Sequence, residues 1–148
     1  MRDRIKKTKP AAIIIVVVGL SAIALYALFH GYFDHGHFEV KRTASSPDGK
    51  LAIVAERWDN NALSGNQYFV LIDDRVPSPR EVRYAYYHGG LIFRAGSDCL
   101  TLTWQDKDRL VISCADGLVN AQEIAVQKDQ WDGVAIAYDR IPRKTGVE

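Results

Sequence analysis

Residues 38–57 read FEVKRTASSPDGKLAIVAER and predict two β-strands joined by a tight turn. Phe38 and Val40 alternate with charged residues before the turn, and apolar residues recur at every second position after it. This period of two is the pattern of a strand. In the turn, SPDGK at residues 46–50, proline presets φ at the second position and glycine supplies the positive φ that returns the chain. The stretch therefore predicts an antiparallel hairpin at the start of a β domain.

The chain beyond this hairpin predicts further short strands. Residues 67–72, QYFVLI, form a third strand that is apolar enough to be buried on both faces. Residues 58–66 read as a turn-rich loop, and Pro77 and Pro79 favour an extended surface loop before residue 81. The remaining strands are expected at residues 81–95 (a hairpin turning at 88–90), 123–127 and 134–138. Together they predict an all-β fold, a small antiparallel β-sandwich or curled β-meander.

Two cysteines bound another predicted hairpin, CLTLTWQDKDRLVISC at residues 99–114. A four-residue loop at 105–108 places Cys99 directly opposite Cys114, within the Cα separation that a disulfide allows. The burial pattern instead groups Leu100 with Cys114, which needs a register shifted by one and moves Cys99 to the other face. A β-bulge or a sheet buried on both sides would reconcile the two patterns. We expect the Cys99–Cys114 disulfide.

The turn at residues 46–50 and the strand after it resemble the hairpins of TolB-like β-propeller blades, but the chain shows no repeat of blades. A closer resemblance is to small bacterial membrane-anchored all-β proteins of unknown function with an SPDGK-type turn. Its matching pieces are this turn, a Gly-aromatic strand at residues 89–93 and a Trp-containing hairpin at residues 100–112. The resemblance implies an N-terminal anchor followed by one β domain, and it implies no activity.

Residues 11–29, AAIIIVVVGLSAIALYALF, carry no charge and predict a transmembrane helix. A helix of this length extends roughly 28 Å, close to the ~30 Å of a bilayer core. Residues 1–10 hold five basic side chains and one acidic side chain, and such flanks stay in the cytoplasm. A cleaved signal peptide is the alternative, because residues 22–24 (AIA) fit a cleavage site. We expect a single-pass protein of the bacterial inner (cytoplasmic) membrane, with its C-terminal domain periplasmic or extracellular.

This interpretation divides the chain into five segments: a basic tail at 1–10, a transmembrane helix at 11–29, a juxtamembrane linker at 30–37, an exported β domain at 38–142 and a flexible tail at 143–148. Beyond the basic tail, fourteen basic and seventeen acidic residues form a faintly acidic balance without a basic stripe. Nucleic-acid binding requires clustered lysine and arginine, so this class of function is excluded. The expected partners are the lipid bilayer and another envelope or exported protein.

Two groups of side chains are candidates for binding. His35, His37 and Glu39 alternate in the linker and could hold a metal ion or sense pH, but no matching distant ligand motif accompanies them, so we interpret them as part of a polar spacer. Aromatic and arginine residues anchor many protein interfaces, and four of them gather in the predicted hairpin at 81–95. These possible interface residues are Arg83, Tyr84, Tyr86 and Tyr87, although we favour the simpler interpretation that the tyrosines fill a thin β core with their hydroxyl groups reaching water.

No spacing in the sequence assembles a catalytic constellation. His88, Asp73, Asp74 and Ser64 carry suitable groups, but nothing in the sequence places them together. We therefore expect no enzyme and no cofactor, and we interpret the chain as a membrane-anchored exported binding or accessory module. The alternatives are an extracytoplasmic enzyme and a sensor that uses the histidines of the linker.

Overall fold

The computed structural model describes residues 10–33, 36–58, 65–115, 117 and 119–144, and within the first helix it describes the side chains of residues 14–26. The chain forms two compact units, Met1–His35 and Gly36–Glu148. The first unit contains helix α1, Pro10–Phe33, and the second contains every strand of the structure. The residues beyond these ranges include part of the basic tail, the linker and the loop after residue 58.

The prediction of a transmembrane helix at residues 11–29 is wrong. A helix does form over the predicted segment, as α1. Within the described residues, however, no helix has both the length and the apolar character needed to cross a membrane.

Five antiparallel strands form the first sheet, sheet A, in the order β1-β2-β3-β4-β7. Its strands are β1 (His37–Ser45), β2 (Leu51–Trp58), β3 (Gln67–Asp73), β4 (Phe93–Ala95) and β7 (Val126–Gln127). The predicted SPDGK turn is confirmed between β1 and β2: the Ser46 amide donates to the Lys50 carbonyl at 2.8 Å, and Gly49 adopts a φ of 93°. Positive φ is the conformation that only glycine takes without strain.

Four strands form the second sheet, sheet B, in the order β5-β6-β9-β8. They are β5 (Leu100–Asp106), β6 (Arg109–Cys114), β8 (Gln130–Trp131) and β9 (Val134–Asp139). Strands β6 and β9 are parallel, so the prediction of a purely antiparallel sandwich is wrong. Parallel neighbours need a long crossover. Here the connection runs through a 3₁₀ helix, η1 (Ala121–Glu123), and through β7 and β8 before β9 returns beside β6.

The predicted strand at 123–127 is therefore only partly correct. Glu123 lies in η1, and the two residues of β7 pair with β4 of sheet A rather than with β9. The predicted strands at 123–127 and 134–138 therefore belong to different sheets. Alternation along the chain predicts that a strand forms, but it does not show which strand it pairs with.

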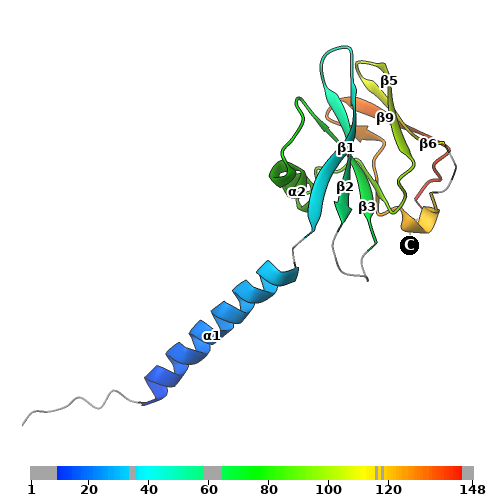
Figure 1. The fold of residues 1–148 in the computed structure, drawn as a ribbon. Helices are drawn as coiled ribbons and strands as arrows, with labels where there is room; N and C mark the ends of the chain where they lie inside the picture. Colours follow the sequence, from blue (N-terminus) through cyan, green and yellow to red (C-terminus); the bar gives the residue numbers. More distant parts are fainter. Residues whose placement is uncertain (1–9, 34–35, 59–64, 116, 118, 145–148) are drawn as a thin grey trace, which may run out of the picture. The chain divides into compact units, whose positions relative to one another are not determined.

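Sheet A is buried on both faces, as predicted for residues 67–72. One face packs against sheet B in a core that includes Val54, Val70, Phe93 and Ile112. The other face packs against helix α2 (Pro79–Tyr87) through Phe38, Ile53, Phe69 and Val82. Figure 1 shows α2 on one side of β1, β2 and β3, and β5, β6 and β9 on the other. The second unit is thus a three-layer arrangement, helix on sheet on sheet.

Helix α2 replaces the first strand of the hairpin predicted at 81–95, and the second strand is present only as the short β4. Ser78 caps it: its hydroxyl accepts from the Glu81 amide, while the Glu81 carboxylate accepts from the Ser78 amide at 2.8 Å. Pro79 occupies the first turn, where its fixed φ suits a helix and its missing N–H costs nothing. Val82 and Tyr86, four residues apart, face the sheet, whereas Tyr84 faces solvent. The alternation of residues 82, 84 and 86 was therefore misread as a strand.

The structure confirms the disulfide between Cys99 and Cys114 and corrects its register. Leu100, not Cys99, pairs with Cys114, and the hairpin closes after an irregularity between Trp104 and Asp106. Cys99 lies one residue before β5 begins. Its side chain therefore does not have to follow the alternation of side chains between the two faces of the strand. Its Cα atom is 4.9 Å from that of Cys114, within the range that a disulfide allows. The bridge therefore forms while Leu100 and Cys114 both remain buried in the core.

Candidate functional site

Helix α2 presents large aromatic side chains to solvent. Tyr84 is 65% exposed and Tyr87 is 47% exposed. Of the other predicted interface residues, Arg83 is half-buried, and Tyr86 packs inward against sheet A. The four residues therefore lie on one helix, not on a ribbon, and only part of the set is available for contact. We call Tyr84 and Tyr87 the aromatic surface of α2.

The inner side of α2 holds this surface in a fixed position. Val82 is fully buried, and the Tyr86 ring lies 5.4 Å from that of Phe38, edge to face. The Tyr86 hydroxyl donates to the side-chain oxygen of Gln67 on β3. The guanidinium carbon of Arg94 lies 5.2 Å from the Tyr86 ring centre, a cation–π contact from β4. An apolar anchor and a polar anchor thus fix the helix to the sheet.

The outer side of α2 ends in a stacked pair. The Tyr84 and His88 rings lie 4.0 Å apart and nearly parallel, at the i, i+4 spacing that aligns side chains on a helix. The His88 ring nitrogen Nδ1 lies 2.8 Å from the Tyr84 carbonyl, which also accepts from the His88 amide at 3.0 Å. The imidazole is therefore engaged at the end of the helix.

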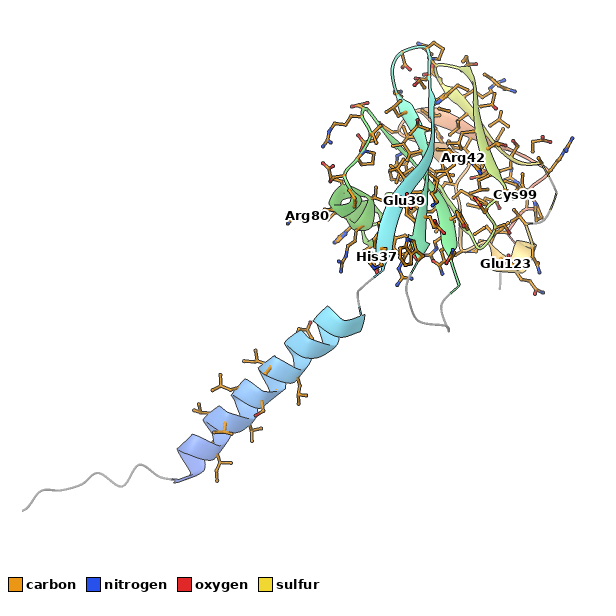
Figure 2. All side chains as sticks on the ribbon, in the orientation of Figure 1. His37, Glu39, Arg42, Arg80, Cys99 and Glu123 are labelled. Atoms are coloured by element: carbon orange, nitrogen blue, oxygen red, sulfur yellow. A yellow bond between two sulfur atoms is a disulfide. The ribbon has the colours of Figure 1, made fainter. Side chains whose placement is uncertain are left out.

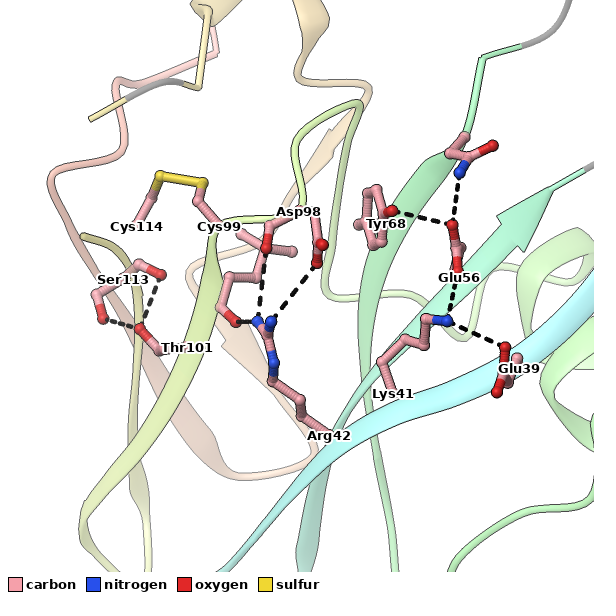
Figure 3. A network of polar contacts seen from close by, with 12 residues as sticks. Glu39, Lys41, Arg42, Glu56, Tyr68, Asp98, Cys99, Thr101, Ser113 and Cys114 are labelled. Carbon is pink, nitrogen blue, oxygen red and sulfur yellow. Dashed lines mark hydrogen bonds and ion pairs between the residues drawn. A yellow bond between two sulfur atoms is a disulfide. The ribbon is translucent and has the colours of Figure 1, made fainter. Parts of the chain in front are cut away.

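A buried carboxylate lies on the opposite face of sheet A. Glu56 is 5% exposed, and three donors surround it (Figure 3): the Asn66 amide at 2.7 Å, the Tyr68 hydroxyl at 2.9 Å and the Lys41 ammonium at 2.9 Å. Lys41 also contacts Glu39 at 3.0 Å. The charge is thus paired and hydrogen-bonded, the condition under which a buried carboxylate is tolerated.

The neighbours of Glu56 set its ionisation. Burial alone raises the pKa of this carboxyl, but the Lys41 and Tyr68 hydrogen bonds, the Lys41 charge and the Asn66 amide together hold the pKa below its usual range. The same hydrogen bond to Glu56 raises the pKa of Lys41. Both groups are charged at neutral pH. The arrangement suits a structural ion pair and offers no proton donor or acceptor poised near neutrality.

The predicted metal candidates do not gather in the described part of the chain. His37 stacks on Trp58 with ring centres 4.4 Å apart, and Glu39 pairs with Lys41. His35 lies outside the described residues. Among the residues that the structure describes, no group of three histidine, cysteine or acidic side chains could hold a metal ion. The metal and pH-sensing alternative gains no support from this geometry.

The predicted catalytic candidates are equally separate. The Asp73 carboxylate accepts from the Asp74 amide at 2.8 Å and so caps a turn after β3. His88 is engaged at the end of α2, and no contact joins it to either aspartate within the described ranges. Ser64 lies outside those ranges. Among His88, Asp73 and Asp74 no acid–base pair forms, so these three described residues offer nothing that favours the enzyme alternative.

Sequence reasoning missed Glu56, Arg94 and Glu123. The latter two line a hollow of about 260 Å³ at one end of sheet A. In the sequence, Glu56 directly follows the apolar run AIVA at residues 52–55, and Arg94 lies within the otherwise apolar stretch LIFRA at residues 91–95. That pattern is a signal for a buried, partnered charge. Glu123 carries no such signal, because only the three-dimensional fold brings η1 beside β4.

Fold and site together define a class: a disulfide-bonded, three-layer β domain that holds an aromatic helix at its surface. No protein-family model, curated protein or solved structure matches the chain. Its function is therefore inferred from its own residues and their geometry.

Proposed function

We propose that this chain is an extracytoplasmic binding module, and that it contacts another exported protein through the aromatic surface of α2. One observation carries the proposal: Tyr84 and Tyr87 remain 65% and 47% exposed on a helix whose other side is fully anchored. Tyrosines that only filled a thin core would turn inward, as Tyr86 does. Rigid, exposed aromatic side chains supply contact area at low entropic cost, and they are enriched at the centres of interfaces.

The charges around this surface favour an acidic partner. Arg80 is exposed on α2 and forms no ion pair within the described residues. Figure 2 shows Arg80 on the outer side of α2. Arg75, in contrast, is neutralised by Glu81. A partner with carboxylates around an aromatic-binding patch complements this arrangement, and charge complementarity speeds encounter.

The compartment is inferred from the disulfide. A bridge between Cys99 and Cys114 persists in an oxidising environment and is reduced in most cytoplasms. No free cysteine accompanies it. This supports an exported location for the β domain, where the partner would also be found.

The proposal is tested by site-specific photo-crosslinking in intact cells. A photoreactive amino acid at Arg80 should capture one protein of defined mass, and the adduct should disappear when Y84A and Y87A are introduced together. With the captured protein purified, these two substitutions should weaken binding by about tenfold or more. Added salt should weaken binding further if the partner is acidic.

The matched control uses Thr103, an exposed residue on β5 of sheet B. The same photoreactive group there should capture nothing in common with Arg80. Equal adducts from both positions, or an adduct that survives the double substitution, would contradict the proposal. Circular dichroism and thermal melting of each variant show that its fold is retained.

A further inference from the structure

A hollow of about 260 Å³ lies where three parts of the fold meet at one end of sheet A. The start of β3, the residues around β4 and the segment that follows η1 contribute its walls. Its lining residues are Gly65, Asn66, Gln67, Arg94, Ala95, Gly96, Glu123 and Ala125. Figure 2 shows Glu123 well away from Arg80 on α2, so this hollow is separate from the aromatic surface of α2.

Arg94 brings a positive charge to the hollow without a counter-ion. Its guanidinium lies over the Tyr86 ring and forms no ion pair among the described residues, and its Nε atom is buried without a hydrogen-bond partner. A buried donor with no partner costs on the order of 1–3 kcal/mol, more when the group is charged. An arginine held against an aromatic ring keeps its planar edge for a carboxylate, which it can bind with two parallel hydrogen bonds.

Glu123 brings a negative charge to the same hollow. It is exposed, and within the described residues no lysine or arginine forms an ion pair with its carboxylate. Its Oε2 atom lies 3.4 Å from the point that a Cβ atom on Gly96 would occupy. The glycine therefore lets this carboxylate lie close to the backbone after β4. The hollow thus contains one positive and one negative side chain that do not neutralise each other.

Two amide side chains add polar atoms to the lining. The Asn66 nitrogen donates to Glu56, which leaves the Asn66 oxygen as an acceptor. The Gln67 oxygen accepts from Tyr86, which leaves the Gln67 nitrogen as a donor. Both side chains are therefore oriented by bonds to groups outside the hollow. The other lining residues are glycines and alanines, so no large apolar side chain is present to bind an apolar ligand.

We propose that this hollow binds a small zwitterion, a free α-amino acid or the end of a short peptide, with its carboxylate at Arg94 and its ammonium at Glu123. The volume lies just below the usual range for ligand sites, which fits a molecule of this size. A simple anion would be repelled by Glu123, and a simple cation by Arg94. A ligand that carries both charges complements both side chains, and this inference does not depend on the proposed contact of α2.

The test is titration of the full chain, observed through the backbone amide signals of Gly65 and Gly96. The probes are glycine and glycylglycine as zwitterions, acetate as a simple anion and methylammonium as a simple cation. We expect at least one zwitterion to shift both signals with a dissociation constant on the order of millimolar. Acetate and methylammonium should bind at least about tenfold more weakly. Equal binding of acetate, or no shift with any probe, would overturn the proposal.

Substitutions separate the site from general charge effects. R94Q and E123Q should each weaken zwitterion binding by about tenfold or more, as expected for the loss of a charge-assisted hydrogen bond. The matched controls R109Q and D139N change exposed charges on sheet B and should leave binding unchanged. Glu123 is exposed, so E123Q tests the proposal even if R94Q disturbs the fold. Binding that survives both R94Q and E123Q would overturn the inference.

Discussion

At the scale of single residues, Glu56 is a buried carboxylate on which three polar contacts converge. E56Q keeps the shape of the side chain and removes its charge, so the Lys41 ammonium loses its buried partner. We expect a loss of about 1–3 kcal/mol in the free energy of unfolding, measured by urea denaturation at pH 7. E39Q removes the exposed carboxylate on the same lysine and should cost less than about 0.5 kcal/mol.

The contribution of Glu56 should also depend on pH. Its folded-state pKa lies below the unfolded value of about 4.3, so between these two values the unfolded state binds more protons. Stability therefore rises with pH in this window. The difference between wild type and E56Q should be constant near neutrality and shrink as the pH falls below about 4. A difference that persisted unchanged at pH 2 would contradict this account.

Single residues also show what the sequence could and could not predict about the sites. The pairing of Cys99 with Cys114 was predicted correctly, although from a register that the structure shifts by one residue. Tyr84 and Tyr87 were named as possible interface residues, and the structure leaves both exposed. Arg94 and Glu123 were missed because they are distant in sequence, and their proximity depends on β4 pairing with β7. No local pattern encodes that pairing.

At the scale of elements, the cap of α2 controls how the aromatic surface is presented. S78A removes the hydroxyl that bonds to Glu81, so the first turn loses its side-chain acceptor. We expect a loss of about 1 kcal/mol in the free energy of unfolding, measured by urea denaturation. S45A, an exposed serine at the end of β1, makes the same chemical change without a cap and should stay within about 0.5 kcal/mol of wild type. Equal effects of both would contradict the capping role.

The second residue of the capping box of α2 is Glu81, whose carboxylate is exposed. Arg75 and the Ser78 amide and hydroxyl lower the pKa of Glu81 to about 2. The carboxylate therefore stays ionised as the pH falls through the usual range for glutamate, and its contribution to the cap is lost only toward pH 2. Helical signal from α2 should accordingly outlast the ionisation of ordinary surface carboxylates during acid titration.

The same helix shows why the elements were only partly predictable. Strands β1, β2 and β3 were expected at nearly their observed bounds, because each is long and regularly patterned. In a segment as short as α2, alternation at Val82, Tyr84 and Tyr86 is compatible with a strand, while Val82 and Tyr86 alone satisfy helical spacing. The Ser78–Glu81 capping box before the apolar residues was the signal that separates the two.

At the scale of the whole β domain, side-chain hydrogen bonds connect the edge strand β1 of sheet A to the edge strand β5 of sheet B. The Trp104 indole on β5 donates to the Ala44 carbonyl on β1 at 3.0 Å. Arg42 on β1, labelled in Figure 3, donates to the Leu100 carbonyl at 2.8 Å. These bonds join sheet A to sheet B. The sequence predicted two layers from its strand pattern, but not which edges would meet, because edge pairing is decided by packing over long sequence distances.

W104F tests the hydrogen bond between Trp104 and Ala44 that joins the two sheets. The substitution keeps an aromatic ring in the core but removes the donor to Ala44, so we expect a loss of about 1–2 kcal/mol by chemical denaturation followed by circular dichroism. The matched control is W131F, whose ring contacts Lys128 at 3.8 Å through its face rather than through the indole nitrogen. It should cost clearly less. A larger loss for W131F would mean that ring size, and not the bond between the sheets, stabilises the domain.

The disulfide acts on the folding of the whole domain, because it closes a ring between residues that are 15 positions apart. By restricting the unfolded chain, a ring of this size contributes about 3 kcal/mol, so C99A with C114A should lower the melting temperature by roughly 10 °C or more. Reductant should lower the melting temperature of the wild type by a similar amount and leave the double variant unchanged. Thiol labelling in intact cells extends the test to the compartment: an exported domain should be labelled only after reduction. Free thiols before reduction would contradict the exported location, whereas full protection with no thermal effect of reductant would contradict the stabilising role of the bridge.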